Sequence, residues 1–493
     1  MLRQSGVLMP MSALPSPYGI GTMGKSARHF VDFLKAAGQK YWQLLPLGPT
    51  SYGDSPYSSF SSYAGNPYFI DLDQLRREGL LTKREIESCD WGDDAERVDY
   101  GKIYDARFPL LRLAFTRAGK LPEGELASFQ RDNAAWLEPY AHYMALKGQF
   151  GMQSWQDWPD EDLRQRRPEA MAKSRAALKD EIDFWRFVQF LFFRQWEALR
   201  AYAKSRGVAL IGDLPIYTAL DSADVWSEPQ FFQLDKNLRP VEVAGVPPDA
   251  FTELGQLWGN PLYDWARMKA DGFGWWIRRV EGARRLYDVI RIDHFRGLES
   301  YWAIPFGDKD ARRGCWKKGP GMELIGVLQR WFSDLRLIAE DLGYTTPEVE
   351  KLLRDSKLPG MKILEFGFDP TGDSLYMPHN CEYNSVCYVG THDNEVIRGW
   401  AANTPKEVLR FASAYLQRGK NESWCHALLR AGMGAPSRLF VAQMQDLLEL
   451  PAETRMNNPG TSEGNWRWRM KPGADSAALA RRLRRLTALY RRL

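Results

Sequence analysis

Four carboxylic acids stand at or near the ends of four separate apolar runs of the sequence. Asp213 ends ALIGDLP, Asp293 ends DVIRIDHF, Glu340 ends LRLIAEDLG and Asp393 follows VCYVG in VCYVGTHDN. One such acid alone is explained by capping of the next helix. A set of four indicates a shared site. One ionised and one protonated carboxyl group are what catalysis at a glycosidic bond requires.

The neighbours of these acids suggest different roles. In RIDHF the two-residue period of a strand puts Arg291 and Asp293 on one face, which favours an ionised Asp293 suited to nucleophilic attack. Three apolar residues precede Glu340, and such surroundings raise a carboxyl pKa, as a general acid requires. His294 and His392 lie beside Asp293 and Asp393 and could hold sugar hydroxyls.

Aromatic residues make up 13% of the chain and include 19 Trp, more than a core requires. Sugar rings present C–H faces that stack on aromatic rings, so a carbohydrate ligand would account for the surplus. The Gly- and Pro-rich segments 52–68, 243–261 and 462–470 carry Trp258, Trp466 and Trp468 as candidate contacts. Trp185 and Trp196 lie in an amphipathic helical pattern and are expected in the core.

These acids need a scaffold that brings strand ends together. Eight short apolar runs alternate with amphipathic stretches, which is the pattern of a (β/α)8 TIM barrel with its active site at the carboxyl ends of the strands. The expected strands are 41–46, 68–72, 209–215, 288–295, 335–343, 362–368, 386–394 and 438–448. A barrel takes about 250 residues, so we expect large, mainly helical insertions.

The organisation expected is one catalytic barrel over residues 1–493. Residues 73–207 form a helical insertion subdomain between strands 2 and 3, and residues 243–261 form an active-site loop. Residues 475–493 form an amphipathic helix whose six arginines, in ARRLRRLTALYRRL, are expected on a solvated face. This basic helix is the sole argument for nucleic-acid binding, which we do not expect.

Composition excludes several other classes. The net charge is +4 over 493 residues, and the five Cys form no CxxC pair, which is typical of a reduced, cytoplasmic protein. The first residues lack the apolar region of a signal peptide, and no apolar run reaches the length of a membrane helix. No P-loop, GxGxxG, HExxH or zinc spacing occurs, so we expect no metal and no cofactor.

Several segments together resemble a known family. GDLPIY (212–217), RIDHFRG (291–297), AEDLG (339–343) and THDNE (391–395) resemble the four short motifs of the α-amylase clan. Longer segments, including DSPYSSFSSYAGNPYFIDL (54–72), VPPDAFTELGQLWGNPLYDW (246–265) and EGNWRWR (463–469), resemble glycoside hydrolase family 77, the 4-α-glucanotransferases or amylomaltases. The resemblance runs in order from near residue 3 to about residue 470.

The resemblance implies a role for each matching residue. Asp293 would be the nucleophile, Glu340 the acid/base and Asp393 the stabiliser of the transition state. Arg291 would orient Asp293. The other substrate-binding residues would hold hydroxyls or stack on sugar rings, and the implied set is Tyr57, Asp213, Gln256, Trp258, His294 and His392.

The expected reaction is retaining transfer of α-1,4-glucan segments from a maltooligosaccharide to the 4-hydroxyl of an acceptor glucan or glucose, through a covalent glucosyl-enzyme. An α-1,4-glucan hydrolase of the same clan shares the first half of this reaction. A non-catalytic glucan-binding protein is the alternative from another class. Only the resemblance of the long loops favours transfer over hydrolysis.

Overall fold

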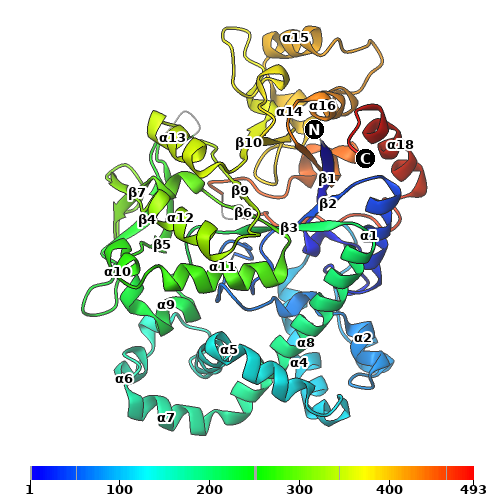
Figure 1. Ribbon diagram of the computed structural model, residues 1–493. Helices are drawn as coiled ribbons and strands as arrows, with labels where there is room; N and C mark the ends of the chain where they lie inside the picture. Colours follow the sequence, from blue (N-terminus) through cyan, green and yellow to red (C-terminus); the bar gives the residue numbers. More distant parts are fainter. Residues whose placement is uncertain (1–2, 52, 249–251, 344, 462) are drawn as a thin grey trace.

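Eight parallel strands form the centre of the molecule. The computed structural model describes residues 3–493 except 52, 249–251, 344 and 462. The strands are β1 (Gln4–Leu8), β2 (Tyr41–Gln43), β3 (Ala209–Leu214), β6 (Val289–Ile292), β9 (Leu337–Ala339), β10 (Gly360–Ile363), β11 (Ser385–Tyr388) and β12 (Leu439–Gln443). Their spatial order is β10-β11-β12-β1-β2-β3-β6-β9, so the predicted barrel is confirmed (Figure 1).

The barrel closes between β9 and β10 with help from a side chain. The Ala339 N–H donates to the Pro359 carbonyl at 2.9 Å, and the Asp341 carboxylate accepts the Met361 N–H at 2.6 Å. Asp341 therefore replaces a backbone acceptor where the ladder of the sheet is interrupted. Asp341 thus belongs to the wall of the barrel, on the other face of the chain from its neighbour Glu340.

One of the predicted strands is wrong and one barrel strand was missed. Residues 67–69 form a 3-10 turn, and α2 (Leu72–Arg77) begins directly after Asp71. The Asn66 side chain accepts the Tyr68 N–H at 3.0 Å, Pro67 follows it, and Asp71 caps α2, so helix-start signals outweigh the apolar run. The missed strand is β1, which pairs in parallel with both β2 and β12.

Helices surround the barrel and fill the long connection between β2 and β3. The connecting helices are α1 (Lys25–Ala36), α9 (Ala223–Ser227), α10 (Trp265–Ala270), α11 (Gly274–Leu286), α12 (Met322–Trp331), α13 (Pro347–Ser356), α14 (Ile397–Asn403), α15 (Lys406–Tyr415), α16 (Trp424–Gly434) and α17 (Met444–Leu447). Within 73–207 the further helices are α3 (Lys83–Glu87), α4 (Tyr100–Thr116), α5 (Glu125–Gln149), α6 (Glu161–Arg164), α7 (Pro168–Ala177) and α8 (Lys179–Ser205). In Figure 1 most of this segment lies on one side of the barrel.

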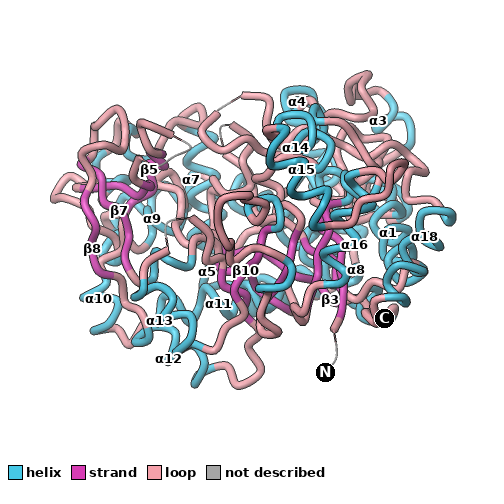
Figure 2. The backbone as a smooth tube through the Cα atoms, turned by 90° about the horizontal axis from the view of Figure 1, so that it is seen from above, coloured by secondary structure: helices cyan, strands magenta, loops and turns pink. Residues whose placement is uncertain are grey.

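The segment 243–261 contains regular structure. β4 (Glu242–Val246) and β5 (Gln256–Pro261) pair antiparallel, with Val246 opposite Gln256. β7 (Ser300–Pro305) and β8 (Cys315–Lys318) complete a four-stranded sheet in the order β5-β4-β7-β8, which lies to one side of the barrel in Figure 2. The two ends of the segment are therefore paired strands. Its residues 249–251 lie outside the described part of the chain.

Most of the tryptophan surplus serves the core. Trp185 and Trp196 are buried in α8, as predicted. Trp466 and Trp468, expected as sugar contacts, are buried as well, at 6% and 5% exposure. Seven tryptophans are less than 2% exposed: Trp42, Trp155, Trp158, Trp196, Trp226, Trp275 and Trp276. The aromatic content therefore mainly reflects packing, and the carbohydrate argument rests on Trp258, which is 36% exposed.

The C-terminal helix α18 (Ala477–Leu489) is amphipathic and packs on α1 and α16. Leu479 and Leu483 are buried. Arg492 departs from the predicted solvated face: it is fully buried and donates to four backbone carbonyls, among them those of Met433 and Ser437. This arginine anchors the chain terminus to the segment that precedes β12. No helix in the described residues is long and apolar enough to cross a membrane.

Candidate active site

The four acids converge at the carboxyl ends of the barrel strands. Ile211 and Val289 belong to the apolar cluster that fills the barrel, so the strand period directs Asp213 and Arg291 into the same interior, one layer above. Asp213 and Arg291 are also partners in the register of β3 and β6. Ile338 lies in the same cluster, which directs Glu340 inward in the same way.

Arg291 joins two of the acids. Its Nη1 donates to both carboxylate oxygens of Asp213 at 2.7 Å and to Asp293 Oδ1 at 3.0 Å. The predicted contact between Arg291 and Asp293 is confirmed. Arg291 and Asp213 are buried, whereas the Asp293 side chain is 25% exposed and remains accessible from the mouth.

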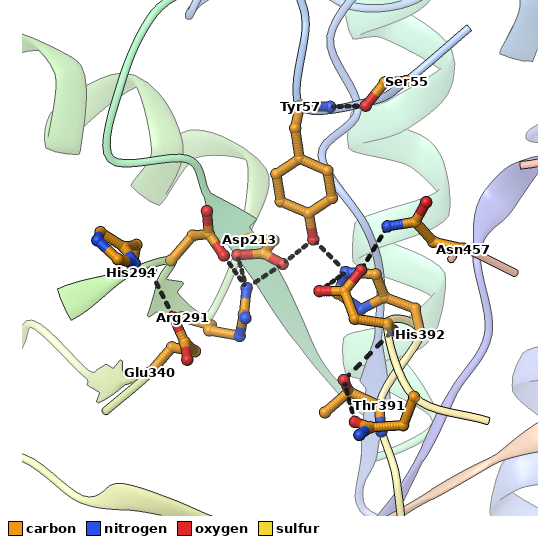
Figure 3. A network of polar contacts seen from close by, with 12 residues as sticks. Ser55, Tyr57, Asp213, Arg291, His294, Glu340, Thr391, His392 and Asn457 are labelled. Carbon is orange, nitrogen blue, oxygen red and sulfur yellow. Dashed lines mark hydrogen bonds and ion pairs between the residues drawn. The ribbon is translucent and has the colours of Figure 1, made fainter. Parts of the chain in front are cut away.

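Tyr57 bridges two strand ends. Its hydroxyl donates to Asp213 Oδ2 at 2.7 Å and lies 2.7 Å from His392 Nε2 (Figure 3). Because the one hydroxyl proton of Tyr57 goes to Asp213, His392 Nε2 must carry the proton that Tyr57 accepts. The Tyr57 and His392 rings are also stacked, with centroids 5.5 Å apart and planes at 12°.

Asp393 is held by a residue that the sequence analysis missed. Asn457 Nδ2 donates to Asp393 Oδ1 at 2.6 Å, and the Asn457 N–H donates to the His392 carbonyl at 3.0 Å. Arg455 Nη2 donates to the Asp393 carbonyl at 2.7 Å. Asn457 lies in a turn, RMNNPG, with no strand before it, and only its place in the folded chain shows its partner.

Glu340 is held by two backbone amides. The His294 N–H donates to Glu340 Oε2 at 2.6 Å, and the Leu342 N–H donates to Glu340 Oε1 at 3.0 Å. His294 has a φ of +47°, in the left-handed region that residues other than glycine rarely adopt. This strained conformation points the His294 N–H at the carboxylate, and such strain is typical of functional sites.

Trp258 and Gln256 lie beside His294. The Trp258 and His294 rings meet edge to face with centroids 4.8 Å apart, and Trp258 Nε1 donates to Gln256 Oε1 at 3.0 Å. The strand β5 therefore brings both residues to the Glu340 side of the mouth. Tyr57, Asp213, Arg291 and His392 lie on the other side, so the ten residues predicted to be catalytic or substrate-binding surround one site.

Burial controls the protonation of this site. It raises the pKa of Glu340 to about 7, against the opposing effects of Arg291 and the two amides. Burial also raises the pKa of Asp293, and Asp213, Glu340 and Asp393 add to this, so burial outweighs Arg291. The contact with Arg291, from which the sequence predicts an ionised Asp293, is thus only one of the effects on this carboxyl group. Asp293 and Glu340 therefore both hold a proton more readily than a free carboxyl group does.

Both histidines at the site are neutral. Burial lowers the pKa of His294 to about 3 and lowers that of His392 below its usual value. Each neutral ring has one N–H donor and one acceptor nitrogen, and the His392 N–H is already used by the Tyr57 hydroxyl. Among the described residues no group of three or more His, Cys, Asp or Glu side chains is arranged to hold a metal ion.

The chain is similar to characterised proteins over its whole length. Residues 9–475 match the family model described as 4-alpha-glucanotransferase. The chain is 48% identical to the 4-alpha-glucanotransferase of Streptococcus pneumoniae and 45% identical to that of Thermus thermophilus, covering 98% and 99% of those proteins and all of this chain. The amylomaltase of Streptococcus agalactiae, solved in complex with acarbose, matches 99% of both chains with a TM-score of 0.97 at 42% identity.

Proposed function

The chain belongs to the 4-alpha-glucanotransferase family, glycoside hydrolase family 77, and we propose that it transfers segments of α-1,4-glucans by a retaining double displacement. The donor would be a maltooligosaccharide, and the acceptor the 4-hydroxyl of another glucan or of glucose. The observation that carries this proposal is the pair Asp293 and Glu340 at adjacent strand ends, where Arg291 contacts Asp293 and a raised pKa keeps a proton on Glu340.

In the first half of the reaction the Glu340 carboxyl gives its proton to the glycosidic oxygen. The Asp293 carboxylate attacks the anomeric carbon, the bond from that carbon to the glycosidic oxygen breaks, and the first product leaves as an alcohol. A pKa of about 7 supports Glu340 as the acid, because it keeps the proton available at neutral pH. The Arg291 contact supports the charge on Asp293.

In the second half Glu340, now ionised, takes the proton of the acceptor's 4-hydroxyl. The freed oxygen attacks the anomeric carbon, and the ester bond to Asp293 breaks, which restores both carboxyl groups. Asp393 would stabilise the positive charge that builds up on the sugar in both transition states. Its contact with Asn457 supports this role, because the contact holds the carboxylate in one orientation.

The remaining residues would bind the sugars. Tyr57 would stack on the transferred ring, while Asp213, His294 and His392 would hold its hydroxyls. Trp258 and Gln256 would contact the acceptor and cover the mouth. A preference for sugar over water of about 100-fold requires only about 2.7 kcal/mol of difference between the two barriers, which stacking on Trp258 and partial exclusion of water could supply.

Incubation with maltotriose tests this proposal. A transferase yields glucose together with a ladder of longer maltooligosaccharides, because each product can serve as the next acceptor. Glucose and maltose without longer products would identify a hydrolase instead. No turnover by the intact protein, with sugar still bound, would identify a glucan-binding protein.

We also propose that 1–493 is one catalytic unit in which residues 73–207 form a helical subdomain. The buried contacts between the segment and the barrel support this arrangement. Gln189 and Gln195 of α8, for example, bond the backbone of Gly65 and Asp71, which follow β2. Deletion of 73–207 should therefore leave an insoluble chain, and a soluble, active remainder would contradict the proposal.

A further inference from the structure

A second cavity lies outside the barrel, between the insertion helices and α11. Its volume is about 270 Å³, and α5, α8, α9, α11 and the segment after β2 line it. Figure 1 shows α5 and α9 below α11, on the side where the insertion helices gather. None of the ten residues around the barrel mouth lines this cavity.

Two aromatic rings form part of its wall. Tyr63 and Trp136 have nearly parallel planes, at 17°, with centroids 6.4 Å apart. A Cβ atom at Gly282 would lie 2.9 Å from Tyr63 Cδ1, so the absence of a side chain there lets the Tyr63 ring lie close against α11. Trp136 Nε1 donates to Asn133 Oδ1 at 3.1 Å, which fixes the indole. Both rings are partly exposed.

Polar groups lie beside these rings. Asn133 and Asp224 line the cavity although they are only 3% and 5% exposed. Asp224 Oδ2 accepts the Ser62 N–H at 2.9 Å, and burial raises its pKa to about 6. The Tyr63 hydroxyl and the Glu281 carboxylate line the cavity without a hydrogen-bond or ion-pair partner among the described residues. The cavity thus combines aromatic faces with free donors and acceptors.

The charge and size of the cavity restrict its ligand. The lining carries more acids than bases: Asp132, Asp224, Glu228 and Glu281 against Arg278 and Arg285. Arg278 is paired with Glu228 at 2.7 Å, and Arg285 bonds Asn133. A phosphate or other anion would be repelled, while a neutral polyhydroxylated ring matches the lining. A volume of 270 Å³ is just below that of pockets for drug-sized ligands, about 300 Å³ and more, and fits one such ring.

We propose that this cavity binds one glucose unit of an α-glucan chain, as a second sugar site separate from the barrel mouth. The choice of ligand rests on the proposed function, because an α-glucan is the neutral sugar polymer that the enzyme would meet. A chain held there would be retained near the enzyme between transfer steps, which raises its effective concentration at the mouth.

Fluorine NMR of the full chain tests the proposal with a local signal for each site. The protein is labelled with 5-fluorotryptophan in an Asp293→Asn background, which prevents turnover, and is titrated with maltotriose. The resonances of Trp136 and Trp258 are assigned with Trp136→Phe and Trp258→Phe. We expect both resonances to shift in a saturable way. Trp331, which is 64% exposed and lines neither site, is the control and should not move.

A double variant distinguishes sugar bound in the cavity from a change at Trp136 that is caused by binding at the barrel mouth. Tyr63→Phe with Glu281→Ala removes two unpartnered polar groups but no packed ring, so the fold is expected to persist. It should raise the dissociation constant for maltotriose measured at the Trp136 resonance about tenfold. The dissociation constant measured at the Trp258 resonance should stay unchanged. A Trp136 response that the double variant does not weaken would overturn the proposal.

The two proposals fail in different ways. A shift at Trp258 without a shift at Trp136 would overturn the second site and leave the proposed function intact. The absence of a shift at both would overturn the second site and also contradict α-glucan binding at the mouth. A shift at Trp136 alone, weakened by the double variant, would support the second site and contradict the proposed function.

Discussion

Arg291 binds Asp213 more closely than it binds Asp293. Its Nη1 lies 2.7 Å from each Asp213 oxygen and 3.0 Å from one Asp293 oxygen. Asp213 therefore takes up much of the positive charge that would otherwise keep Asp293 ionised. Burial is the main cause of the raised pKa of Asp293, and this sharing adds to it although a guanidinium touches the carboxylate.

Asp213→Asn should shift the acidic limb of the pH profile to lower pH. The substitution removes a negative charge beside Asp293 and leaves Arg291 to Asp293 alone, so the pKa of Asp293 should fall. Turnover itself should also decrease, because the hydroxyl of Tyr57 loses its negatively charged acceptor. The measurement is kcat/KM for maltotriose between pH 4 and pH 9. An acidic limb that moves to higher pH would contradict this account, and Asp446→Asn, outside the mouth, serves as the control.

The alkaline limb of the pH profile should reflect the ionisation of Glu340. Its pKa is raised from 4.5 to about 7 by burial, so the protonated form needed for the first step is lost as the pH rises through about 7. Activity on maltotriose should fall accordingly. α-Maltotriosyl fluoride needs no proton on its leaving group, so the rate of fluoride release in single-turnover experiments should lack this limb. The same alkaline limb with both substrates would assign it to another group.

Asn457→Ala should lower kcat for maltotriose about 10-fold to 100-fold. The side chain holds Asp393 at 2.6 Å, and without it the carboxylate can rotate away from the developing charge. The KM should change less than kcat. Asn458→Ala is the matched control, because Asn458 is the adjacent residue of the same type and its side chain makes no hydrogen bond to Asp393. Equal losses in both variants would indicate a general disturbance of the turn.

Asp446→Asn should stabilise the protein at alkaline pH. Asp446 is 1% exposed, accepts the Ile397 N–H at 2.8 Å through Oδ1, and has no partner for Oδ2 among the described residues. Burial, with a smaller effect of the nearby Glu395 carboxylate, raises its pKa from 3.8 to about 7. The folded state therefore binds the proton more tightly than the unfolded state. This contribution to stability is present at acidic pH and is lost progressively as the pH rises to about 7.

The size of this effect follows from the same linkage. Between pH 5 and pH 8 the variant should gain about 2 kcal/mol in the free energy of unfolding relative to the parent protein. Urea unfolding at both pH values measures it. A variant that is less stable than the parent at pH 8 would show that the ionised carboxylate is needed in the fold.

The barrel could be predicted from the sequence because its strands are short apolar runs between amphipathic helices. β6 and β9 end directly before Asp293 and Glu340, β3 contains Asp213 near its end, and the strand period placed Arg291 beside Asp293. The run 68–72 misled the prediction, because its apolar residues pack as a 3-10 turn capped by Asn66. β1 lies outside the predicted strands, since four of its five residues are buried in the wall and carry no alternating pattern.

Site residues could be predicted where neighbouring residues in the sequence indicate their role. The prediction failed where their role depends on packing in the folded chain. Asn457 lies far along the chain in a turn, and its partner Asp393 is known only from the fold. The burial that raises the pKa of Asp293 likewise arises from the closed barrel and not from its neighbours in sequence. A loop-like segment suggests that Trp466 contacts sugar, but its ring packs against Tyr57 and His392.

In the proposed reaction Asp293 carries the sugar between donor and acceptor. A Glu340→Gln variant incubated with α-maltotriosyl fluoride tests it most directly, since fluoride leaves without a proton while transfer to an acceptor lacks its base. Digestion and mass spectrometry should then find one maltotriosyl unit on the peptide that contains Asp293. A label on the peptide of Asp213 or Asp393, or release of product with inverted configuration and no label, would contradict the account.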